Sequence, residues 1–315
     1  MESTMLEIAA NRYRVKASSL KLLGGFDNNV FECLTKERHF ILKFLMGTDS
    51  SSIKRELDWM NYLSEHGLNI TSPIYSELGN LIEEIRYENK HYIVVAYEYA
   101  KGHFIHDLET EFSLIKQWGK VMGRMHLLAK KYDSNKISKY REWHESSIIT
   151  DFPVSAGDKV YDKWKEMIYK LNQLSKTKDC YGVIHNDLHQ NNFHVHENDL
   201  ILFDFGDIEV NWFAYDIAIC LFHAIQAVPQ SESKQKVEFA ERFIDTFLSG
   251  YTTENSIDET WIAKIPFFLN YRQIYSFVYF SKHVNLEDSD ESVKTALSNM
   301  KYNIEHDIPF IELRF

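Results

Sequence analysis

The chain has 315 residues, with 35 Lys and Arg residues against 46 Asp and Glu residues, which gives a formal net charge of −11. Its 44% hydrophobic and 14% aromatic content, with only 12 Gly and 5 Pro, is typical of an ordered globular protein and excludes disordered, collagen-like and low-complexity chains. The negative charge repels phosphate backbones and anionic membranes, so we expect neither nucleic acid nor a membrane as a partner.

The cysteines and the N-terminal residues bear on the compartment of the protein. Cys33, Cys180 and Cys220 are odd in number, far apart and form no Cys-x-x-Cys pair, which argues against a disulfide framework and a cysteine-rich zinc site. Residues 1–4 lack the basic and then apolar pattern of a signal peptide, and no apolar run is long enough to span a bilayer. We therefore expect a soluble protein of the cytoplasm.

The N-terminal part of the chain has mostly strand-like patterns. Short β-branched and aromatic runs between polar turns predict strands within residues 29–34, 39–44, 81–86 and 92–97. One helix interrupts them; it is expected to begin near the serines at 50–52, whose hydroxyls would cap it, and to end at Gly67. The segment 88–90 is expected to form a hairpin turn. The whole pattern predicts a five-stranded antiparallel sheet with one helix packed on it.

Helical periodicity dominates the chain after residue 98. It predicts helices over roughly 113–131, 158–176, 213–227, 232–250, 258–285 and 289–305. The exception is 183–210, where two short apolar runs flank Glu197-Asn198-Asp199. We therefore expect an α+β protein with an N-terminal lobe over 1–98 and a mainly helical C-terminal lobe over 99–315.

The densest polar cluster lies in this exceptional segment. Asp187, Asn192 and Asp204 are expected at the ends of adjacent short strands, where loops can present them to a cleft. Carboxylate and amide oxygens are ligands that magnesium prefers, and this ion usually keeps waters or substrate phosphates in its other positions. The cluster therefore predicts a magnesium site that handles a nucleotide.

The pattern His-x-Asp-x-x-x-x-Asn at 185–192, followed by Asp-Phe-Gly at 204–206, resembles the catalytic and metal loops of the kinase-like phosphotransferases. The resemblance is strongest to the aminoglycoside phosphotransferase family, whose relatives include choline, homoserine and methylthioribose kinases. It covers almost the whole chain, because the strand-rich and helical parts match that family's two lobes in order and size. It implies a protein-kinase-like two-lobed fold, ATP or GTP as the phosphate donor, Mg²⁺ as the metal, and an acceptor site in the C-terminal lobe.

The resemblance also assigns roles to individual residues. It asks for a lysine on the third strand and an acid on the following helix, and Lys43 and Glu56 stand there. Lys43, held by Glu56, would contact the α- and β-phosphates, while Asn192 and Asp204 would hold the metal. Asp187 would accept the proton of the attacking hydroxyl.

The turn at residues 23–30 is the expected phosphate-covering turn. It has neither a Gly-x-Gly-x-x-Gly nor a Walker pattern, and resembles instead the Gly-Gly-x-x-Asn turn of the small-molecule branch, whose backbone N–H groups meet the phosphates. Its residues include Gly25, Phe26, Asp27 and Asn28, of which Gly25 and Asn28 are assigned to the nucleotide. The resemblance places adenine against a linker and between two side chains. The linker residues are Glu98, Tyr99 and Ala100, and the side chains are those of Ile41 and Phe203.

Several polar residues have a structural interpretation beside the functional one. His185, His189, His194 and His196 alternate and could collect zinc, but no His-Glu-x-x-His pattern accompanies them, and hydrogen-bonded structural roles are favoured. His185 is expected to brace the catalytic loop.

Four further residues near the motif are assigned to the surroundings of the site. His126 is expected to pack beneath the catalytic loop and Asp216 to brace it, since a buried carboxylate needs hydrogen bonds. Asp207 and Glu209 form either an acidic acceptor site or a solvated rim.

Three functions remain open. The leading one is transfer of a γ-phosphate to a hydroxyl of a small molecule, and the acidic charge favours an aminoglycoside or a related cationic compound. Residues 204–216 also resemble a bacterial branch that includes homoserine kinases and a stress-response serine/threonine protein kinase. The third is a catalytically idle nucleotide-binding protein. In each case we expect a monomer or a homodimer.

Overall fold

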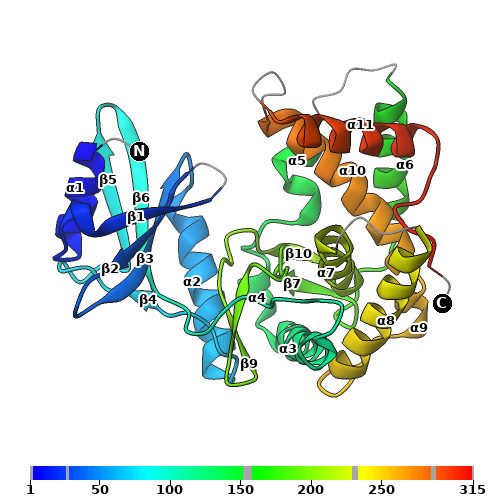
Figure 1. Ribbon diagram of the computed structural model, residues 1–315, viewed down its shortest axis with the longest axis horizontal. Helices are drawn as coiled ribbons and strands as arrows, with labels where there is room; N and C mark the ends of the chain where they lie inside the picture. The colour runs from blue at the N-terminus through cyan, green and yellow to red at the C-terminus, as the bar shows by residue number, and fades with distance from the viewer. Residues whose placement is uncertain (1–2, 26–27, 152–157, 229–232, 285–288, 314–315) are drawn as a thin grey trace. The chain divides into compact units, whose positions relative to one another are not determined.

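The computed structural model describes residues 3–25, 28–151, 158–228, 233–284 and 289–313 (Figure 1). The chain divides into two compact units. The first unit is Met1–His103 with Phe193–Gly206, and the second is Phe104–Asn192 with Asp207–Phe315. The predicted α+β class is confirmed, because an antiparallel sheet occupies the first unit and helices dominate the second. The units differ from the predicted continuous lobes over 1–98 and 99–315 in two respects, because the first unit extends to His103 and also includes Phe193–Gly206.

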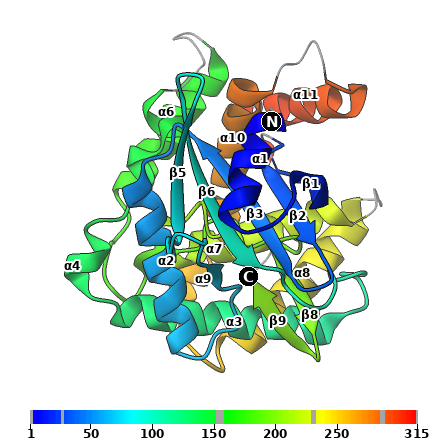
Figure 2. The ribbon, with the colours of Figure 1, turned by 90° about the vertical axis from the view of Figure 1, so that its left-hand side faces the viewer.

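The first unit is built on a six-stranded antiparallel sheet in the order β1-β2-β3-β6-β4, with β5 also paired to β6 (Figure 2). Its elements are α1 (Ser3–Arg12), the 3₁₀ turn η1 (Ala17–Ser19), β1 (Leu20–Gly24), β2 (Val30–Leu34), β3 (His39–Met46), α2 (Ser50–Glu65), β4 (Pro73–Ile74), β5 (Ile82–Tyr87), β6 (Lys90–Glu98), β8 (Phe193–His196) and β9 (Asp199–Leu202). The prediction of five strands and one helix was wrong. The two residues of β4 are too few to show an alternating pattern, and α1 precedes the segment that the strand signals cover.

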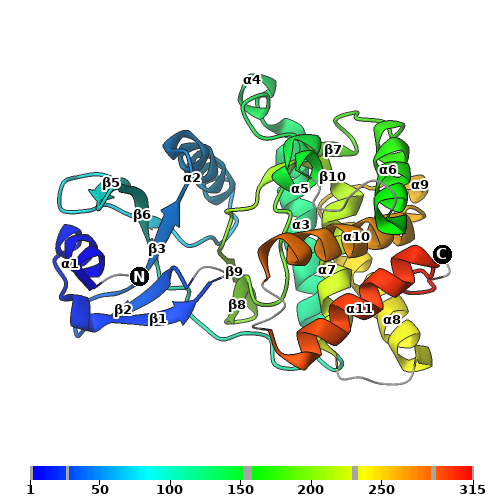
Figure 3. The same cartoon turned by 90° about the horizontal axis from the view of Figure 1, so that it is seen from above.

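The two faces of the sheet contact different helices. On one face, Phe40 and Leu42 of β3 pack with Met5 and Tyr13 from the α1 region in a buried apolar cluster. Side chains alternate between faces along a strand, so Ile41 and Lys43 lie on the other face. On that face Tyr97 of β6, which is paired with Ile41, donates a hydrogen bond from its hydroxyl to Glu56 of α2. Figure 3 shows α1 and α2 on opposite sides of the sheet.

Two hairpins have two-residue turns of the same kind. Glu88 and Asn89 join β5 to β6 with φ of 46° and 62°, and Glu197 and Asn198 join β8 to β9 with φ of 51° and 66°. Two consecutive residues with positive φ form the turn whose twist matches that of antiparallel strands, and Asn tolerates this conformation well. The hairpin predicted at 88–90 is therefore confirmed, and the structure adds a second one between the two apolar runs that flank residues 197–199.

The N-cap of α2 differs from the prediction. Asp49 is the cap, and its carboxylate accepts the backbone N–H of Ser51 at 3.2 Å, whereas the serines themselves lie inside the first turn. A carboxylate at this place also interacts favourably with the helix dipole. The end of the helix follows the prediction, with Gly67 in the left-handed region at φ 88°.

The second unit is mainly helical. Its elements are α3 (Phe112–Lys131), α4 (Ser134–Ile137), the 3₁₀ turn η2 (Trp143–Glu145), α5 (Ser147–Thr150), α6 (Lys159–Asn172), β7 (Tyr181–Ile184), β10 (Glu209–Trp212), α7 (Phe213–Ala227), α8 (Ser233–Tyr251), α9 (Glu259–Ile262), α10 (Ile265–His283) and α11 (Glu291–Glu305). The single helix predicted over 258–285 is two helices, because Pro266 starts a new one in the first turn of α10. The helix predicted over 158–176 ends earlier, at Asn172.

Glycines let α3 and α8 approach each other closely. A methyl group at Gly119 would overlap the carbonyl oxygen of Phe247, and one at Gly123 would overlap that of Tyr251. The antiparallel strand pair β7 and β10 lies beside α3. The catalytic loop starts where β7 ends, so this packing fixes the position from which the loop departs.

None of the helices within the described residues combines the length and the apolar character that a membrane span requires.

Candidate functional site

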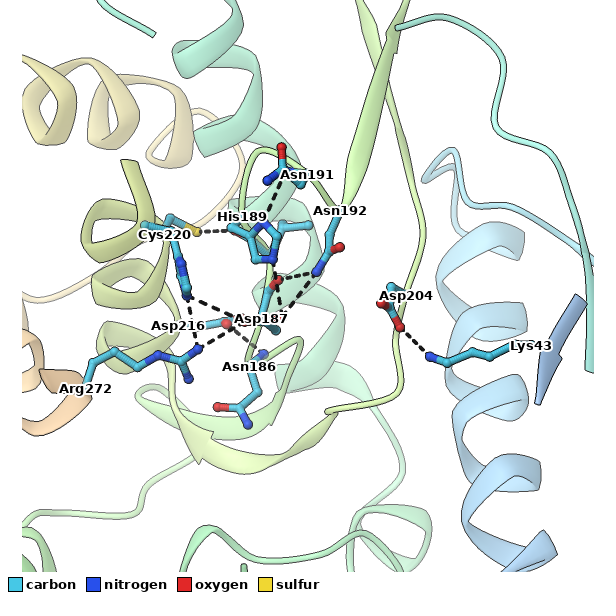
Figure 4. Close-up of polar contacts among 12 residues, drawn as sticks. Lys43, Asn186, Asp187, His189, Asn191, Asn192, Asp204, Asp216, Cys220 and Arg272 are labelled. Atoms are coloured by element: carbon cyan, nitrogen blue, oxygen red, sulfur yellow. Dashed lines mark hydrogen bonds and ion pairs between the residues drawn. The ribbon is translucent and has the colours of Figure 1, made fainter. Parts of the chain in front are cut away.

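Asp187 and Asn192, predicted as base and metal ligand, lie together in the loop between β7 and β8. The Asn192 amide nitrogen donates to the backbone oxygen of Asp187 at 2.8 Å and to its carboxylate at 3.3 Å. The amide oxygen then points away from Asp187, as Figure 4 shows. An oxygen presented in this way suits a hard cation.

The Asp187 carboxylate is surrounded by three nitrogen-bearing side chains of the second unit. Arg272 of α10 donates to Oδ1 at 3.1 Å, His223 Nε2 of α7 lies 3.7 Å from Oδ1, and His189 Nε2 lies 3.4 Å from Oδ2 (Figure 4). Burial alone would raise the pKa of Asp187, but the hydrogen bond of His189 and the charge of Arg272 outweigh burial and lower this pKa. Asp187 is therefore ionised at neutral pH and can accept a hydrogen bond from a hydroxyl.

The loop is held from beneath by α7. Asp216, fully buried, accepts the backbone N–H of His185 at 3.1 Å and that of Asn186 at 2.9 Å. The thiol of Cys220 donates to the backbone oxygen of Leu188 at 3.0 Å. The prediction that Asp216 braces the catalytic loop is confirmed.

His126 supports Asp216 from α3. Its Nε2 lies 3.0 Å from the Asp216 carboxylate and its Nδ1 lies 3.0 Å from the hydroxyl of Tyr251. Burial lowers the pKa of His126, so the ring is neutral, donates to the carboxylate and accepts from Tyr251. The predicted position of His126 beneath the loop is confirmed.

Lys43 and Asp204 meet within the first unit. The Lys43 ammonium lies 2.5 Å from Asp204 Oδ1, although the two residues are 161 positions apart in sequence. Asp204 follows β9 with a φ of 61°, and the Asp204 side chain is 49% exposed. A lysine and a carboxylate side by side, both reachable from solvent, can share a phosphate and its metal counterion.

Glu56 is buried, with 5% of its surface exposed, and accepts a hydrogen bond from the Tyr97 hydroxyl at 3.0 Å. Burial, reinforced by the negative charge of Glu56, raises the pKa of Tyr97 well above its ordinary value. Tyr97 is therefore a protonated donor that orients Glu56. The predicted link between Glu56 and Lys43 stays a prediction.

The turn that is predicted to cover the phosphates is tight at both described ends, whereas Phe26 and Asp27 lie outside the described residues. Gly25 has a φ of 84°, and Asn28, at φ 50°, donates its backbone N–H to Gly25 at 3.1 Å. A side chain at Gly25 would collide with Asn29. Asn29 itself donates to the backbone oxygen of Phe44 at 2.7 Å and ties the turn to β3 beside Lys43.

The linker is fixed by a histidine. The carbonyl oxygen of Ala100 accepts Nδ1–H of His194 at 2.7 Å, and burial lowers the pKa of His194, which keeps the ring neutral. His194 also contacts the ring of Phe203 edge to face, at 5.1 Å between centroids. Tyr99 stacks on His39, with 3.7 Å between ring centroids, and contacts the ring of His194 edge to face, with 5.9 Å between centroids. Three residues predicted around adenine, Tyr99, Ala100 and Phe203, therefore belong to one contact network of the first unit.

The alternative zinc site has no geometric support. Within the part of the chain that the structure describes, no three His, Cys, Asp or Glu side chains gather so that they could hold a metal ion. His194 serves the linker and His189 serves Asp187. The structural interpretation of these histidines is the better one.

The two acidic residues after Asp204 have different surroundings. Glu209 is buried and bonded by Arg141 at 3.1 Å and Asn211 at 2.8 Å, and burial raises its pKa. Glu209 is thus not part of a solvated rim. Asp207 is exposed, and its backbone oxygen accepts the side chain of Asn186, next to Asp187.

The residues of these networks that the sequence did not reveal include Asn29, His194 as a linker residue, His223 and Arg272. His223 and Arg272 lie in helices whose apolar and aromatic neighbours indicate only a core. No local pattern separates them from structural residues, because their partner lies far away in sequence.

The chain was compared with known proteins. The phosphotransferase enzyme family matches residues 19–260. An amicoumacin kinase of Bacillus subtilis (strain 168) is 30% identical over 322 residues, which cover 100% of this chain and 95% of the relative. A solved amicoumacin kinase in complex with AMP-PNP, Ca²⁺ and Ami has a TM-score of 0.90 at 29% identity and covers 99% of this chain and 96% of its own. A microcompartment-associated aminopropanol kinase shares the fold, with a TM-score of 0.78 at 18% identity over 96% of this chain and 95% of its own.

These similarities confirm the kinase-like fold and the resemblance that the loop motifs carry. They also confirm the prediction of an enzyme, a kinase that phosphorylates a small molecule. The chain belongs to the phosphotransferase enzyme family.

Proposed function

We propose that the protein transfers the γ-phosphate of ATP to a hydroxyl of a small molecule, with Asp187 as the base and a divalent metal at the phosphates. The observation that carries the proposal is the ionised Asp187 carboxylate beside Asn192, on a loop whose backbone is fixed by Asp216. Phosphoryl transfer depends mainly on positioning the reactants and on neutralising charge. A fixed loop with an ionised carboxylate provides the positioning.

The donor set fits magnesium. Asp204 offers a half-exposed carboxylate, and Asn192 offers an amide oxygen because its nitrogen is occupied by Asp187. One carboxylate and one amide, with phosphate oxygens and water, are the usual surroundings of Mg²⁺ in phosphotransferases. When bound, the metal neutralises charge that develops on the phosphates.

The first unit would bind the nucleotide. Lys43, whose ammonium lies 2.5 Å from Asp204, would turn to the phosphates, with Glu56 as its partner. Gly25 would turn its backbone N–H group to the phosphates, and Asn28, whose own N–H bonds the Gly25 carbonyl oxygen, would hold the turn in place. The adenine contacts would come from Ile41, Glu98, Tyr99, Ala100 and Phe203. His194 supports this arrangement because it fixes the linker oxygen of Ala100.

Asp187 would act on the acceptor. A hydroxyl that donates a hydrogen bond to its carboxylate is oriented toward the γ-phosphate. It loses its proton to Asp187 as the new O–P bond forms and the bond between the γ-phosphorus and the β,γ-bridging oxygen breaks, with ADP as the leaving group.

The acceptor would be a cationic compound such as an aminoglycoside or a related antibiotic. The net charge of −11 and the exposed Asp207 beside the catalytic loop favour a positively charged ligand. Amicoumacin is the first acceptor to test, because the 30% identical relative is an amicoumacin kinase. An acidic cytoplasmic monomer or homodimer without nucleic acid or membrane partners completes the proposal.

The test is a coupled kinase assay with ATP and Mg²⁺ over amicoumacin, aminoglycosides, choline, homoserine and sugars. We expect turnover with at least one amine-bearing acceptor, and mass spectrometry should find its phosphate ester. Phosphorylation of protein serine or threonine without turnover of any of these acceptors would contradict the proposal.

A further inference from the structure

Arg272 occupies an unusual place in the second unit. It extends from α10 to the catalytic loop, where Nη2 lies 3.1 Å from Asp187 Oδ1 and 3.1 Å from His223 Nε2 (Figure 4). Only 11% of its side chain is exposed, and the guanidinium lies 5.6 Å from the ring centre of Tyr275. Arg272 is therefore a buried cation in contact with the proposed base, unlike the partner of a solvent-exposed ion pair.

The chemistry of the three groups fixes their hydrogen bonds. A guanidinium donates only, so the His223 ring must accept at Nε2 and carry its proton on Nδ1. Burial and then the charge of Arg272 lower the pKa of His223 to about 3, which agrees with a neutral ring. One nitrogen of Arg272 therefore uses its two hydrogens for two acceptors, the His223 ring and the Asp187 carboxylate.

This arrangement orients the base. Arg272 makes the shortest side-chain contact of the Asp187 carboxylate, at Oδ1, whereas Asn192 and His189 contact Oδ2 at 3.3 Å and 3.4 Å. A rigid contact at Oδ1 determines where Oδ2 points. The positive charge of Arg272 also offsets the negative charge of the Asp187 carboxylate. Without this compensation, the carboxylate would repel the anionic γ-phosphate that has to approach it.

We propose that Arg272, oriented by His223, is a positioning residue for phosphoryl transfer that holds the Asp187 carboxylate and neutralises it toward the incoming phosphate. The inference rests on the proposed function, in which Asp187 is the base. Arg272 acts through Asp187 and would not itself contact the nucleotide.

The first experiment compares full-length wild type with Arg272→Met in the transfer of phosphate from MgATP to amicoumacin. Arg272→Met should lower kcat by roughly 10- to 100-fold, because a misplaced base costs this much, while the KM for ATP stays within about twofold. Arg272→Lys keeps the positive charge but loses the planar guanidinium, so its kcat should lie between that of wild type and that of Arg272→Met. Lys282→Met is the matched control, since it breaks another ion pair of α10, with Asp151 at 3.3 Å, and should leave kcat unchanged.

Two further measurements separate positioning from a general structural effect. Added guanidinium should restore part of the activity of Arg272→Ala. In an Asp187→Asn background, Arg272→Met should cause little additional loss, because it acts through the missing carboxylate. Two results would overturn the inference. One is a kcat of Arg272→Met within about twofold of the wild-type kcat, and the other is a loss of kcat through Arg272→Met that is as large in the Asp187→Asn background as in the wild-type background. Wild-type transfer that Asp187→Asn lowers by about 10²- to 10⁴-fold supports the proposed function whichever result Arg272→Met gives.

Discussion

The buried side chains of His126 and Asp216 lie 3.0 Å apart, and the same carboxylate accepts two backbone N–H groups of the catalytic loop. The shape of the loop therefore depends on α3 and α7 as well as on hydrogen bonds within the loop, such as the one from Asn192 to the backbone oxygen of Asp187. Asn186 illustrates the consequence, since its backbone adopts a φ of 67°, a conformation that the hydrogen bond to Asp216 helps to hold.

Replacing this carboxylate should affect both stability and catalysis. Asp216→Ala leaves two buried N–H groups and the ring of His126 without their acceptor, so the free energy of unfolding should fall by about 3–5 kcal/mol. Urea unfolding measures this loss. Asp245→Ala on α8 is the control, because its side chain is exposed and the change should stay within about 0.5 kcal/mol. A loss of similar size in both variants would show that Asp216 does not brace the loop.

The Lys43 and Asp204 pair makes a prediction about nucleotide binding. MgATP at about 100 times its Kd should raise the unfolding free energy of wild type by about 2.7 kcal/mol. Asp204→Asn should lose the part of this stabilisation that depends on Mg²⁺, and Lys43→Met should lose most of it, because under the proposed function each removes a charge that would face the phosphates. Thermal-shift titrations with ATP, with and without Mg²⁺, measure both effects.

Lys21→Met serves as the matched lysine control, on the exposed side of β1. It should respond to MgATP as wild type does. An Asp204→Asn variant that retains the full Mg²⁺-dependent shift would show that Asp204 does not hold the metal.

His223 makes the unfolding free energy depend on pH. Burial and then Arg272 depress its pKa in the folded state to about 3, from an ordinary value of 6.5, so the folded protein resists protonation. Its contribution to stability is present above pH 6.5 and is lost as the pH falls toward 3. Between about pH 7.5 and about pH 5.5, wild type should lose about 1 kcal/mol more than His223→Gln, which cannot be protonated in this range. Equal losses in urea unfolding would mean that His223 is charged in the folded protein.

Much of the fold follows from local patterns. The hairpin at 88–89 was predictable because turn residues lie between two alternating runs, and α7 was predictable from its periodicity. The short strand β4 was not, because its two residues pair with β6 only in the folded sheet. The break before α10 had a signal, Pro266, that the surrounding apolar residues obscured.

In the candidate site, too, some contacts follow from the local sequence and others depend on the tertiary fold. Asp187 and Asn192 are five residues apart, and their spacing predicted that they would meet. Arg272 lies 85 residues from Asp187, and its partner is determined by how α10 packs on α7. A sequence pattern cannot show such a contact, because an arginine among aromatic residues is equally compatible with a helix surface.

The central claim is that Asp187 is the base, and the most direct measurement is kcat for phosphate transfer from MgATP to amicoumacin by Asp187→Asn. Asparagine keeps the shape of the side chain but cannot accept the proton, so kcat should fall by about 10²- to 10⁴-fold while the MgATP-induced thermal shift is unchanged. An Asp187→Asn enzyme whose kcat stays within a few-fold of wild type would contradict the account.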